Sequence, residues 1–345
     1  MSTNYPSGKK NILIFGGAGF IGSHLCSELI RENNVICVDN FSTSHVENIR
    51  FLLQNPNFEF IRHDVNEPLN LDDLPELKKF QVKVQGVQEI YTMACPTTAK
   101  NFSERVIDTL LSNSVGMRNM LDTAVKYKAK LVHASSVVIY GPRTKDRVFV
   151  DENDLGEVDC LGPRACYDEG KRFAETMVST YRDFYKLDFK IARIFRTYGP
   201  NMVLNDGQMV PDFMINALDN KPLVIYGDEN FSTSLCFVQD IVQGLVKLMD
   251  SQLSGPINMG SDVEVKIVDV ARRIIEITNS KSQIVFEKPL LFMSPLALPN
   301  LKLAKTELGW FPVVTLEQGL VKSLDYIRAH KQLMDTSEFL ESNED

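Results

Sequence analysis

The sequence predicts an α/β fold, in which a doubly wound parallel sheet is followed by a smaller C-terminal α/β lobe. Over the first 140 residues, short apolar runs alternate with amphipathic patterns of helical period, which is the order of repeated β-α units. Beyond residue 200 the predicted elements become shorter and richer in glycine and proline. A chain of 345 residues is long enough for one large domain with an appended lobe.

The predicted elements follow one another along the chain. Strands are expected in short runs rich in apolar residues, at 10–15, 35–40, 58–64, 89–94, 131–135 and 189–195. Helices are expected where apolar residues recur with a helical period, at 20–33, 44–54, 106–127, 164–186 and 315–330. The segment 71–88 is polar and poorly periodic, which predicts a surface excursion, and the pattern between 141 and 163 predicts loops.

Composition and charge narrow the classes of function. Apolar residues make up 44% of the chain and charged residues 24%, which is the balance of a soluble globular protein. The formal charge of -8 and the lack of a basic stripe argue against a nucleic-acid partner, which Lys and Arg would have to bind. No apolar run approaches the roughly 20 residues of a membrane span, so we expect no membrane partner and a cytoplasmic location.

Thiol and imidazole side chains show no pattern of a metal site. The chain has 6 cysteines without a CxxC pair, and we expect them as buried free thiols, not as disulfides or zinc ligands. The histidines are scattered, without the spacing that metal ligands require. We therefore expect no metal.

A glycine-rich turn lies between the first predicted strand and the helix after it. Gly16, Gly19 and Gly22 have GxxGxxG spacing, which lets the backbone approach a pyrophosphate at a helix N-terminus. Asp39 closes the next strand, where a carboxylate can accept hydrogen bonds from both hydroxyls of an adenosine ribose and would repel a 2′-phosphate. The pattern therefore favours NAD over NADP, the alternative being a merely tight turn.

Further cofactor contacts are expected around this turn. Asp64 ends the third strand, where it could meet the adenine edge or only cap the local backbone. The expected cofactor-binding residues are Gly16, Gly19, Phe20, Ile21, Gly22, Asp39, Asn40, Asp64, Val65, Ala94, Tyr167 and Lys171. The last two belong to the expected catalytic set as well.

A tyrosine, a lysine and a serine form that catalytic set. Tyr167 and Lys171 lie one turn apart on a predicted helix, and hence on one face. A free tyrosine has a pKa near 10, which the ammonium and a positive nicotinamide ring would lower, so that the phenolate takes a proton from a sugar hydroxyl. Ser136, at a strand end, is expected to hydrogen-bond the reacting alcohol. The structural alternatives are a surface pair and a serine that satisfies backbone.

Several stretches resemble the extended short-chain dehydrogenase/reductases that modify nucleotide sugars. They are GGAGFIGSHL, VDNF, IRHDV, ACP, RACYDEGKR, ARIFRTYGPNM, PLVIYGD, GLVKLM and LGWFP. Within that family the nearest resemblance is to the UDP-glucuronate decarboxylases, and GPRACYDEGKR is specific to that branch. The resemblance covers about residues 10 to 328.

The resemblance implies a Rossmann-like domain, bound NAD, a nucleotide-sugar substrate and a homodimer that packs the helices near 106–127 and 164–186 against their mates. It also implies oxidation of the sugar at C4 by Ser136, Tyr167 and Lys171, followed by loss of carbon dioxide and return of the hydride. The expected domains are an N-terminal extension at 1–9, a mainly NAD-binding domain at 10–200, a mainly substrate-binding lobe at 201–330 with an interleaved boundary, and an acidic tail at 331–345.

Four departures fall at positions that the family turns towards the sugar nucleotide. Val137 and Val138 stand where the branch has Ser-Glu, which removes acid–base catalysis typically worth roughly 100- to 10,000-fold in rate. Thr233 stands where an arginine usually faces the sugar carboxylate, and 295–298 replace a basic run with an arginine used on the diphosphate. Arg196 stands where an asparagine is usual.

Arg196 is the expected replacement for the missing cations. It could enter the substrate pocket and bind a phosphate or carboxylate, or it could point outwards or pair with an acid such as Asp206. The expected substrate-binding residues are Pro96, Ser136, Arg196 and Thr233.

Three functions remain open from the sequence. The first is NAD-dependent C4 oxidation of a nucleotide-linked sugar, similar to UDP-glucuronate decarboxylase. The second is epimerisation, or formation of a 4-keto sugar, with decarboxylation lost. The third is an NAD-binding protein with little turnover, against which the retention of Ser136, Tyr167 and Lys171 counts.

Overall fold

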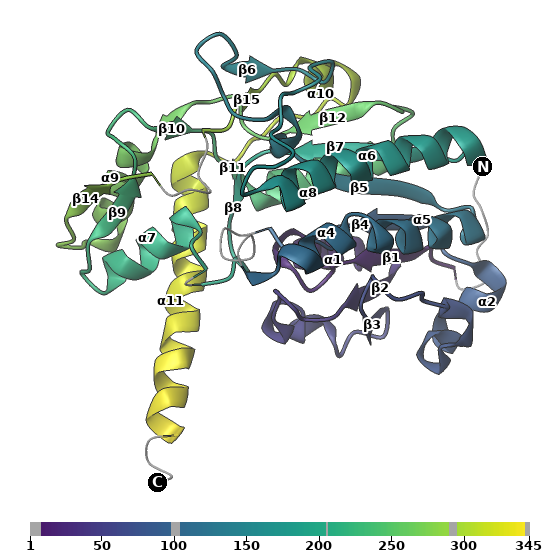
Figure 1. Cartoon of the computed structure of the whole chain (residues 1–345). Helices are drawn as coiled ribbons and strands as arrows, with labels where there is room; N and C mark the ends of the chain where they lie inside the picture. The colour runs from purple at the N-terminus through teal and green to yellow at the C-terminus, as the bar shows by residue number, and fades with distance from the viewer. Residues whose placement is uncertain (1–7, 98–103, 205, 290–294, 342–345) are drawn as a thin grey trace.

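Seven parallel strands form the central sheet of the computed structural model, in the order β12-β7-β5-β4-β1-β2-β3 (Figure 1). The structure describes residues 8–97, 104–204, 206–289 and 295–341. The strands are β1 (Asn11–Phe15), β2 (Asn34–Asp39), β3 (Phe58–Arg62), β4 (Glu89–Thr92), β5 (Lys130–Ser136), β7 (Phe189–Ile194) and β12 (Pro256–Met259). The order of crossovers confirms the predicted doubly wound α/β fold, and β12 shows that the second half of the chain completes the sheet.

Helices cover both faces of this sheet because each strand buries side chains on both sides. Along β1, Ile12 and Ile14 join one apolar cluster, whereas Leu13 and Phe15 join the other. The first cluster includes residues of α1 (Phe20–Leu29) and α8 (Val238–Asp250). The second includes residues of α5 (Val115–Tyr127) and α6 (Ala165–Tyr185), and α6 also packs against α4 (Val106–Ser112).

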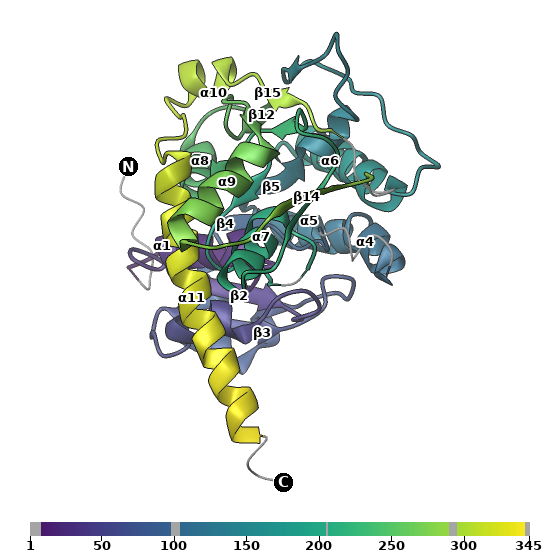
Figure 2. The same ribbon diagram turned by 90° about the vertical axis from the view of Figure 1, so that its left-hand side faces the viewer.

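The smaller lobe is built from short strand pairs and three helices. Its helices are α7 (Met209–Leu218), α9 (Ile267–Thr278) and α11 (Leu316–Glu341), and α10 (Lys302–Glu307) packs against β12. The strand pairs are β9 (Leu223–Tyr226) with β14 (Ile284–Glu287), β10 (Ser232–Thr233) with β13 (Val265–Lys266), β8 (Thr197–Tyr198) with β11 (Cys236–Phe237), and β6 (Phe149–Val150) with β15 (Leu298–Pro299). Figure 2 shows α11 running along the molecule beside α9 and α7.

The predicted helix at 106–127 is wrong in one respect, because the chain breaks it into α4 and α5. Asn113 Nδ2 donates to Thr109 O at 2.8 Å, and Ser114 Oγ donates to Leu110 O at 2.8 Å. Such bonds offer the backbone an alternative to a continuous helix. The predicted helix at 164–186 is confirmed as α6.

Two further segments differ from their predicted form. Residues 44–54 form two short 3₁₀ helices, η1 (Val46–Asn48) and η2 (Arg50–Leu52), in place of one helix. The segment 71–88 contains η3 (Leu71–Asp73), η4 (Pro75–Phe80) and α2 (Val82–Gln85). It is no surface excursion, because its apolar side chains join the second core cluster. These side chains are Leu71, Leu77, Phe80, Val82 and Val87. The short 3₁₀ turns give them no regular helical period in the sequence.

The structure also bears on the predictions for the C-terminal tail and the cysteines. The helix α11 continues past residue 330, where we expected the acidic tail to begin. The 6 cysteines are free, as predicted; Cys26, Cys37 and Cys236 are buried, while Cys160 is exposed.

Within the described ranges, no helix has both the length and the apolar composition of a membrane span. In the same residues, no group of three His, Cys, Asp or Glu side chains is placed to hold a metal ion.

Candidate active site

Two adjoining cavities lie at the C-terminal ends of the central strands. The larger has a volume of about 630 Å³ and the smaller about 200 Å³. Both are lined by Gly16, Gly19, Thr43, Met93 and Cys95, so they form one continuous cleft. In open α/β sheets this edge is where ligands bind.

The glycine turn forms the floor of the cleft. Gly16 has a φ of 77°, and a Cβ there would lie 2.6 Å from Ala94 N. A Cβ at Gly22 would lie 2.1 Å from Gly16 O. No side chain fits at either position, because backbone already occupies the space.

The N-terminus of α1 opens onto this turn. Its N-cap, Gly19, has no side chain, and the first turn of the helix carries no acidic residue. Phe20, Ile21 and Gly22 line the larger cavity. The free N–H groups and positive dipole end of such a helix favour an anion, so the turn fits a dinucleotide diphosphate.

Asp39 lines the smaller cavity, but its carboxylate is already engaged. It accepts hydrogen bonds from Ala18 N at 3.0 Å, Phe41 N at 2.9 Å and Ser44 Oγ at 2.8 Å. A carboxylate has about four acceptor positions, which leaves room for about one more donor. The expectation that Asp39 accepts from both ribose hydroxyls is therefore too generous, and its repulsion of a 2′-phosphate stays a prediction.

Other expected cofactor residues also meet in the smaller cavity. Asp64 accepts from Asn40 Nδ2 at 2.9 Å and from Asn66 N at 2.8 Å, so it caps the local backbone while it lines the cavity. Val65 and Ala94 line the same space, and so does Pro96, which we expected on the substrate side. The local capping role of Asp64 is therefore present, and its contact with the adenine edge stays a prediction.

The predicted catalytic set is brought together on the wall of the larger cavity. Ser136, Tyr167 and Lys171 are all buried, and all three line it. The hydroxyls of Tyr167 and Ser136 share a hydrogen bond. Lys171 Nζ donates to Ala134 O at 2.8 Å, and Ser136 Oγ accepts from Val138 N at 3.4 Å. The arrangement is therefore no surface pair, and Ser136 both satisfies a backbone N–H and meets Tyr167.

Burial shifts the pKa values of this set. Burial raises the pKa of Tyr167, while the hydrogen bond with Ser136 and the charge of Arg164 oppose the rise. Burial also lowers the pKa of Lys171, which the charges of Cys95 and Glu175 oppose. Lys171 by itself therefore does not bring the pKa of the phenol below its usual range, and the lowering that we expect from the nicotinamide ring together with Lys171 stays a prediction.

Arg196 enters the larger cavity and does not point outwards. Its Nε is buried without a hydrogen-bond partner among the described residues, although Asp206 lines the same cavity. Burial, together with the charge of Arg164, lowers the pKa of Arg196 to about 10. Arg164 also lines the cavity, but it donates to Asp168 at 3.1 Å. The arrangement leaves Arg196 suited to an anion from a ligand.

Most of the other residues that depart from the family pattern place apolar side chains on the wall of the larger cavity. Val137 and Val138 are buried and line the larger cavity, as does Leu296. Thr233 is the exception: it is buried in β10, donates to Ser234 O at 3.3 Å and is not among the lining residues in the described part of the chain. Thr233 pairs with Val265 of β13, and the expectation of a sugar contact at Thr233 gains no support from its position.

Sequence reasoning missed an acidic corner of the cavity. Asp212, in the first turn of α7, lines the larger cavity together with Asp206. Its Oδ1 is buried without a hydrogen-bond partner in the described residues. Burial and the charge of Asp206 raise the pKa of Asp212 to about 6. The signal in the sequence was a carboxylate in a helix that is apolar apart from Asp212 and Asn216.

Known proteins resemble this chain in sequence and in fold. The model of the NAD dependent epimerase/dehydratase family matches residues 12–260. UDP-glucuronic acid decarboxylase 1 of Xenopus tropicalis is 38% identical over 334 residues, which cover 96% of this chain and 75% of that protein. The Danio rerio protein of that name is 39% identical over 320 residues, or 92% of this chain and 72% of that one. The solved UDP-glucuronic acid 4-epimerase from Bacillus cereus in complex with NAD gives a TM-score of 0.78 at 25% identity, over 92% of this chain and 99% of that chain.

Substitution of Gly22 by alanine tests the glycine turn. The new Cβ would displace Gly16 O, so we expect Gly22→Ala to weaken NAD binding by at least about tenfold, or about 1.4 kcal/mol. Isothermal titration with NAD measures the loss. Gly255→Ala is the control, because a Cβ there meets open space. Wild-type affinity in a folded Gly22→Ala variant would contradict the assignment.

Proposed function

The chain belongs to the NAD-dependent epimerase/dehydratase family, and from that premise we propose that it oxidises C4 of a nucleotide-linked sugar, as the UDP-glucuronate decarboxylases it resembles imply. The observation that carries the proposal is the meeting of Ser136, Tyr167 and Lys171 with the glycine turn in one cavity. A protein that only binds NAD has no use for this proton relay.

The residues of the cleft fit NAD. Gly16, Gly22 and the N-terminus of α1 would hold its diphosphate, and Asp39 would accept from its adenosine ribose. When bound, NAD supplies the hydride acceptor and the positive charge of its oxidised ring. That charge is the one that the buried phenol of Tyr167 lacks.

Proton transfer falls to the three buried side chains. Ser136 orients the C4 hydroxyl, and Tyr167 Oη takes its proton while the hydrogen on C4 leaves as hydride, which converts the alcohol into a ketone. Lys171, fixed by Ala134 O, stabilises the phenolate with its ammonium. The reverse transfer restores the alcohol.

The fate of the ketone depends on the side chains beside Ser136. A β-keto acid loses carbon dioxide with little help, which favours decarboxylation of a uronic acid. However, Val137 and Val138 offer no proton-handling group next to Ser136, and this favours epimerisation or release of the 4-keto sugar as the second candidate. Mass spectrometry of the product separates these outcomes.

Tyr167→Phe tests the reaction. We expect it to lose at least about 100-fold in the rate at which UDP-glucuronate reduces bound NAD, read at the NADH absorbance band. Because burial raises the pKa of Tyr167, the wild-type rate should rise with pH through the neutral range. Tyr185→Phe, exposed on the same helix, is the control. No reduction of NAD by any nucleotide sugar in the wild type would contradict the proposal.

Arg196 is proposed to bind an anionic group of the substrate. A buried guanidinium nitrogen without a partner is costly, and a carboxylate or phosphate would satisfy it with charge-assisted hydrogen bonds. Its place in the cavity that holds Ser136 and Tyr167 puts this contact on the substrate side.

Arg196→Gln distinguishes the two anions. If Arg196 holds the sugar carboxylate, affinity for UDP-glucuronate falls about tenfold or more by calorimetry, whereas affinity for UDP-glucose is unchanged. If it holds a phosphate, both affinities fall together. Arg143→Gln is the control, because Arg143 pairs with Glu264 at 2.7 Å and does not line the cavity. Unchanged binding of both ligands would exclude Arg196 from the site.

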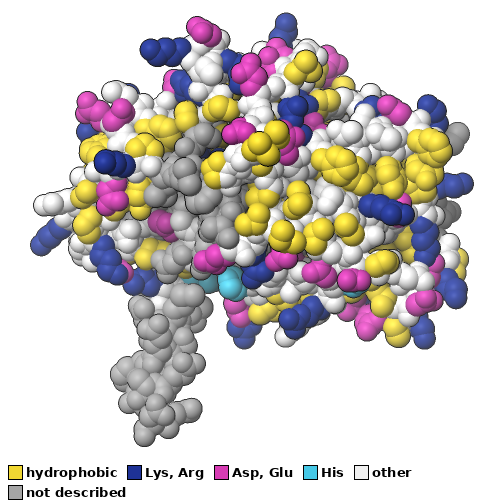
Figure 3. Space-filling model, viewed as in Figure 1, with side chains coloured by type: hydrophobic (Ala, Val, Ile, Leu, Met, Phe, Trp, Pro, Cys, Tyr) yellow, Lys and Arg dark blue, Asp and Glu magenta, His cyan; other side chains and the backbone are white. Residues whose placement is uncertain are grey.

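A second copy of the chain is the proposed partner. Large apolar side chains are exposed on the outer helices, with Ile107 of α4 64% exposed and Phe173 and Phe184 of α6 51% and 76% exposed. Figure 3 shows hydrophobic side chains gathered over this face. Packing these helices against the same helices of another copy would remove the apolar surface from water.

Phe173→Lys tests the dimer. Placing a charge in the proposed contact should convert a dimer into a monomer in sedimentation velocity measurements, without loss of secondary structure. Phe286→Lys, at an apolar residue of the smaller lobe that is 45% exposed, should leave the dimer intact. A wild-type protein that sediments as a monomer at micromolar concentration would refute the interface.

A further inference from the structure

Three consecutive residues at the end of β5 contact three successive turns of α6. Ser136 shares a hydrogen bond with Tyr167, and Ala134 O accepts from Lys171 Nζ at 2.8 Å. The third contact, in which Ser135 Oγ donates to Glu175 Oε1, has no part in the proposed proton transfer. It nevertheless lies between the other two along the strand.

Glu175 is held in a buried ion pair. Its side chain is 12% exposed and that of Arg193, on β7, is 10% exposed. Arg193 Nη2 donates to Oε2 at 2.8 Å and Nε donates to Oε1 at 3.0 Å, which is a bidentate contact. Ser135 and Arg193 are register partners on neighbouring strands, so both reach α6 from the same face of the sheet.

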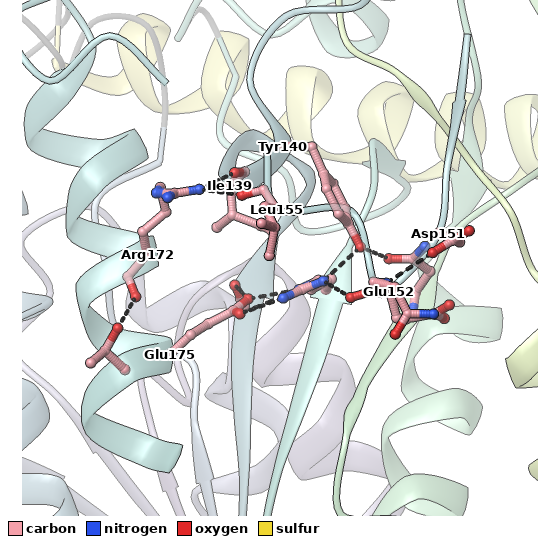
Figure 4. Close-up of polar contacts among 12 residues, drawn as sticks. Ile139, Tyr140, Asp151, Glu152, Leu155, Arg172 and Glu175 are labelled. Atoms are coloured by element: carbon pink, nitrogen blue, oxygen red, sulfur yellow. Dashed lines mark hydrogen bonds and ion pairs between the residues drawn. The ribbon is translucent and has the colours of Figure 1, made fainter. Parts of the chain in front are cut away.

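The network continues into the turn that follows Ser136. Arg193 Nη1 donates to the Tyr140 hydroxyl at 2.9 Å and to Glu152 O at 2.9 Å, and the Tyr140 hydroxyl donates to Asn258 Oδ1 at 2.7 Å. Figure 4 shows Glu175 at one side of the network and Tyr140 and Glu152 at the other. Tyr140 ends η5 (Val137–Tyr140), which carries the valine wall of the cavity.

We propose that Glu175 is a positioning residue of the active centre, which holds α6 against the end of β5 through Ser135 and Arg193. It fixes the separation of Tyr167 and Lys171, on the helix, from Ser136, on the strand. Its carboxylate satisfies three donors at once, so no shorter or neutral side chain reproduces all of these contacts. The kinetic consequence rests on the proposed function.

Glu175 also acts on Lys171 through its charge. Burial lowers the pKa of Lys171, and the negative charge of Glu175 one helical turn away opposes this. Cys95 acts in the same direction on Lys171, and Lys171 in turn lowers the pKa of buried His133, so that this ring stays neutral.

Three other groups surround the carboxylate of Glu175. Arg193 stays charged, because the contacts with Glu175 outweigh its burial. Tyr140 stays neutral, since burial raises its pKa. Burial also raises the pKa of Glu152, whose Oε1 accepts from Asn258 N at 2.9 Å.

Glu175→Gln removes the charge and keeps the size of the side chain. The loss of the negative charge favours the neutral amine of Lys171, and so does the positive charge of Arg193, which is left without its counter-ion. The protonation midpoint of Lys171 should therefore fall by about one pH unit or more. Competitive labelling of the full chain with acetic anhydride at a series of pH values, with mass spectrometry of the peptide that contains Lys171, measures this midpoint.

Two more variants separate charge from position. Glu175→Asp keeps the charge on a shorter arm, so we expect a loss of about tenfold or more in kcat with an unchanged KM and an unchanged Lys171 midpoint. Glu169→Gln makes the same chemical change on the same helix, where Glu169 is 37% exposed and pairs with Arg172 at 3.6 Å, and should alter neither quantity. If Glu175→Gln does not fold, the kcat of Glu175→Asp still tests the positioning role of Glu175.

The outcomes distinguish this inference from the proposed function. A wild-type kcat in Glu175→Asp and a wild-type Lys171 midpoint in Glu175→Gln would overturn the role of Glu175, while NAD reduction by the wild type would still support C4 oxidation. A wild type that reduces no NAD would overturn the proposed function, and the labelling midpoint would then decide the inference alone. Equal losses in Glu169→Gln would also overturn it.

Discussion

A buried amine that donates to a backbone carbonyl stands at the middle of the centre. Lys171 Nζ reaches Ala134 O at 2.8 Å, and this contact joins the helix α6 to the end of the strand β5. Tyr167, one turn earlier, then meets Ser136, and Glu175, one turn later, meets Ser135. Because a charged amine is costly to bury, the cation is tolerated only where this acceptor and nearby negative charges compensate it.

The cleft combines two surfaces with different chemistry. On the cofactor side, backbone and small residues dominate, and a side chain at Gly16 or Gly22 would collide with main chain. On the substrate side, the wall is apolar at Val137 and Val138 and carries an arginine without a partner in the described chain, Arg196. The cofactor side therefore fits one kind of ligand, whereas on the substrate side a few side chains determine which sugar binds.

The parts that sequence reasoning predicted are those with a local cause. The glycine turn, the strands and α6 follow from spacing and periodicity, and Tyr167 with Lys171 needed only one helical turn to be placed together. The break in the helix at Asn113 depends on a side chain that bonds the preceding turn. The direction of the Tyr167 pKa and the inward position of Thr233 depend on tertiary burial and strand pairing, which no local pattern reveals.

The sheet takes its last strand from the far side of the chain. With β12 paired to β7, a fragment ended near residue 200 would bare a row of backbone donors and acceptors along β7 and lose the cover of α8. The half of the chain that carries the glycine turn therefore depends on α8 and β12, which lie beyond residue 200, to complete its sheet.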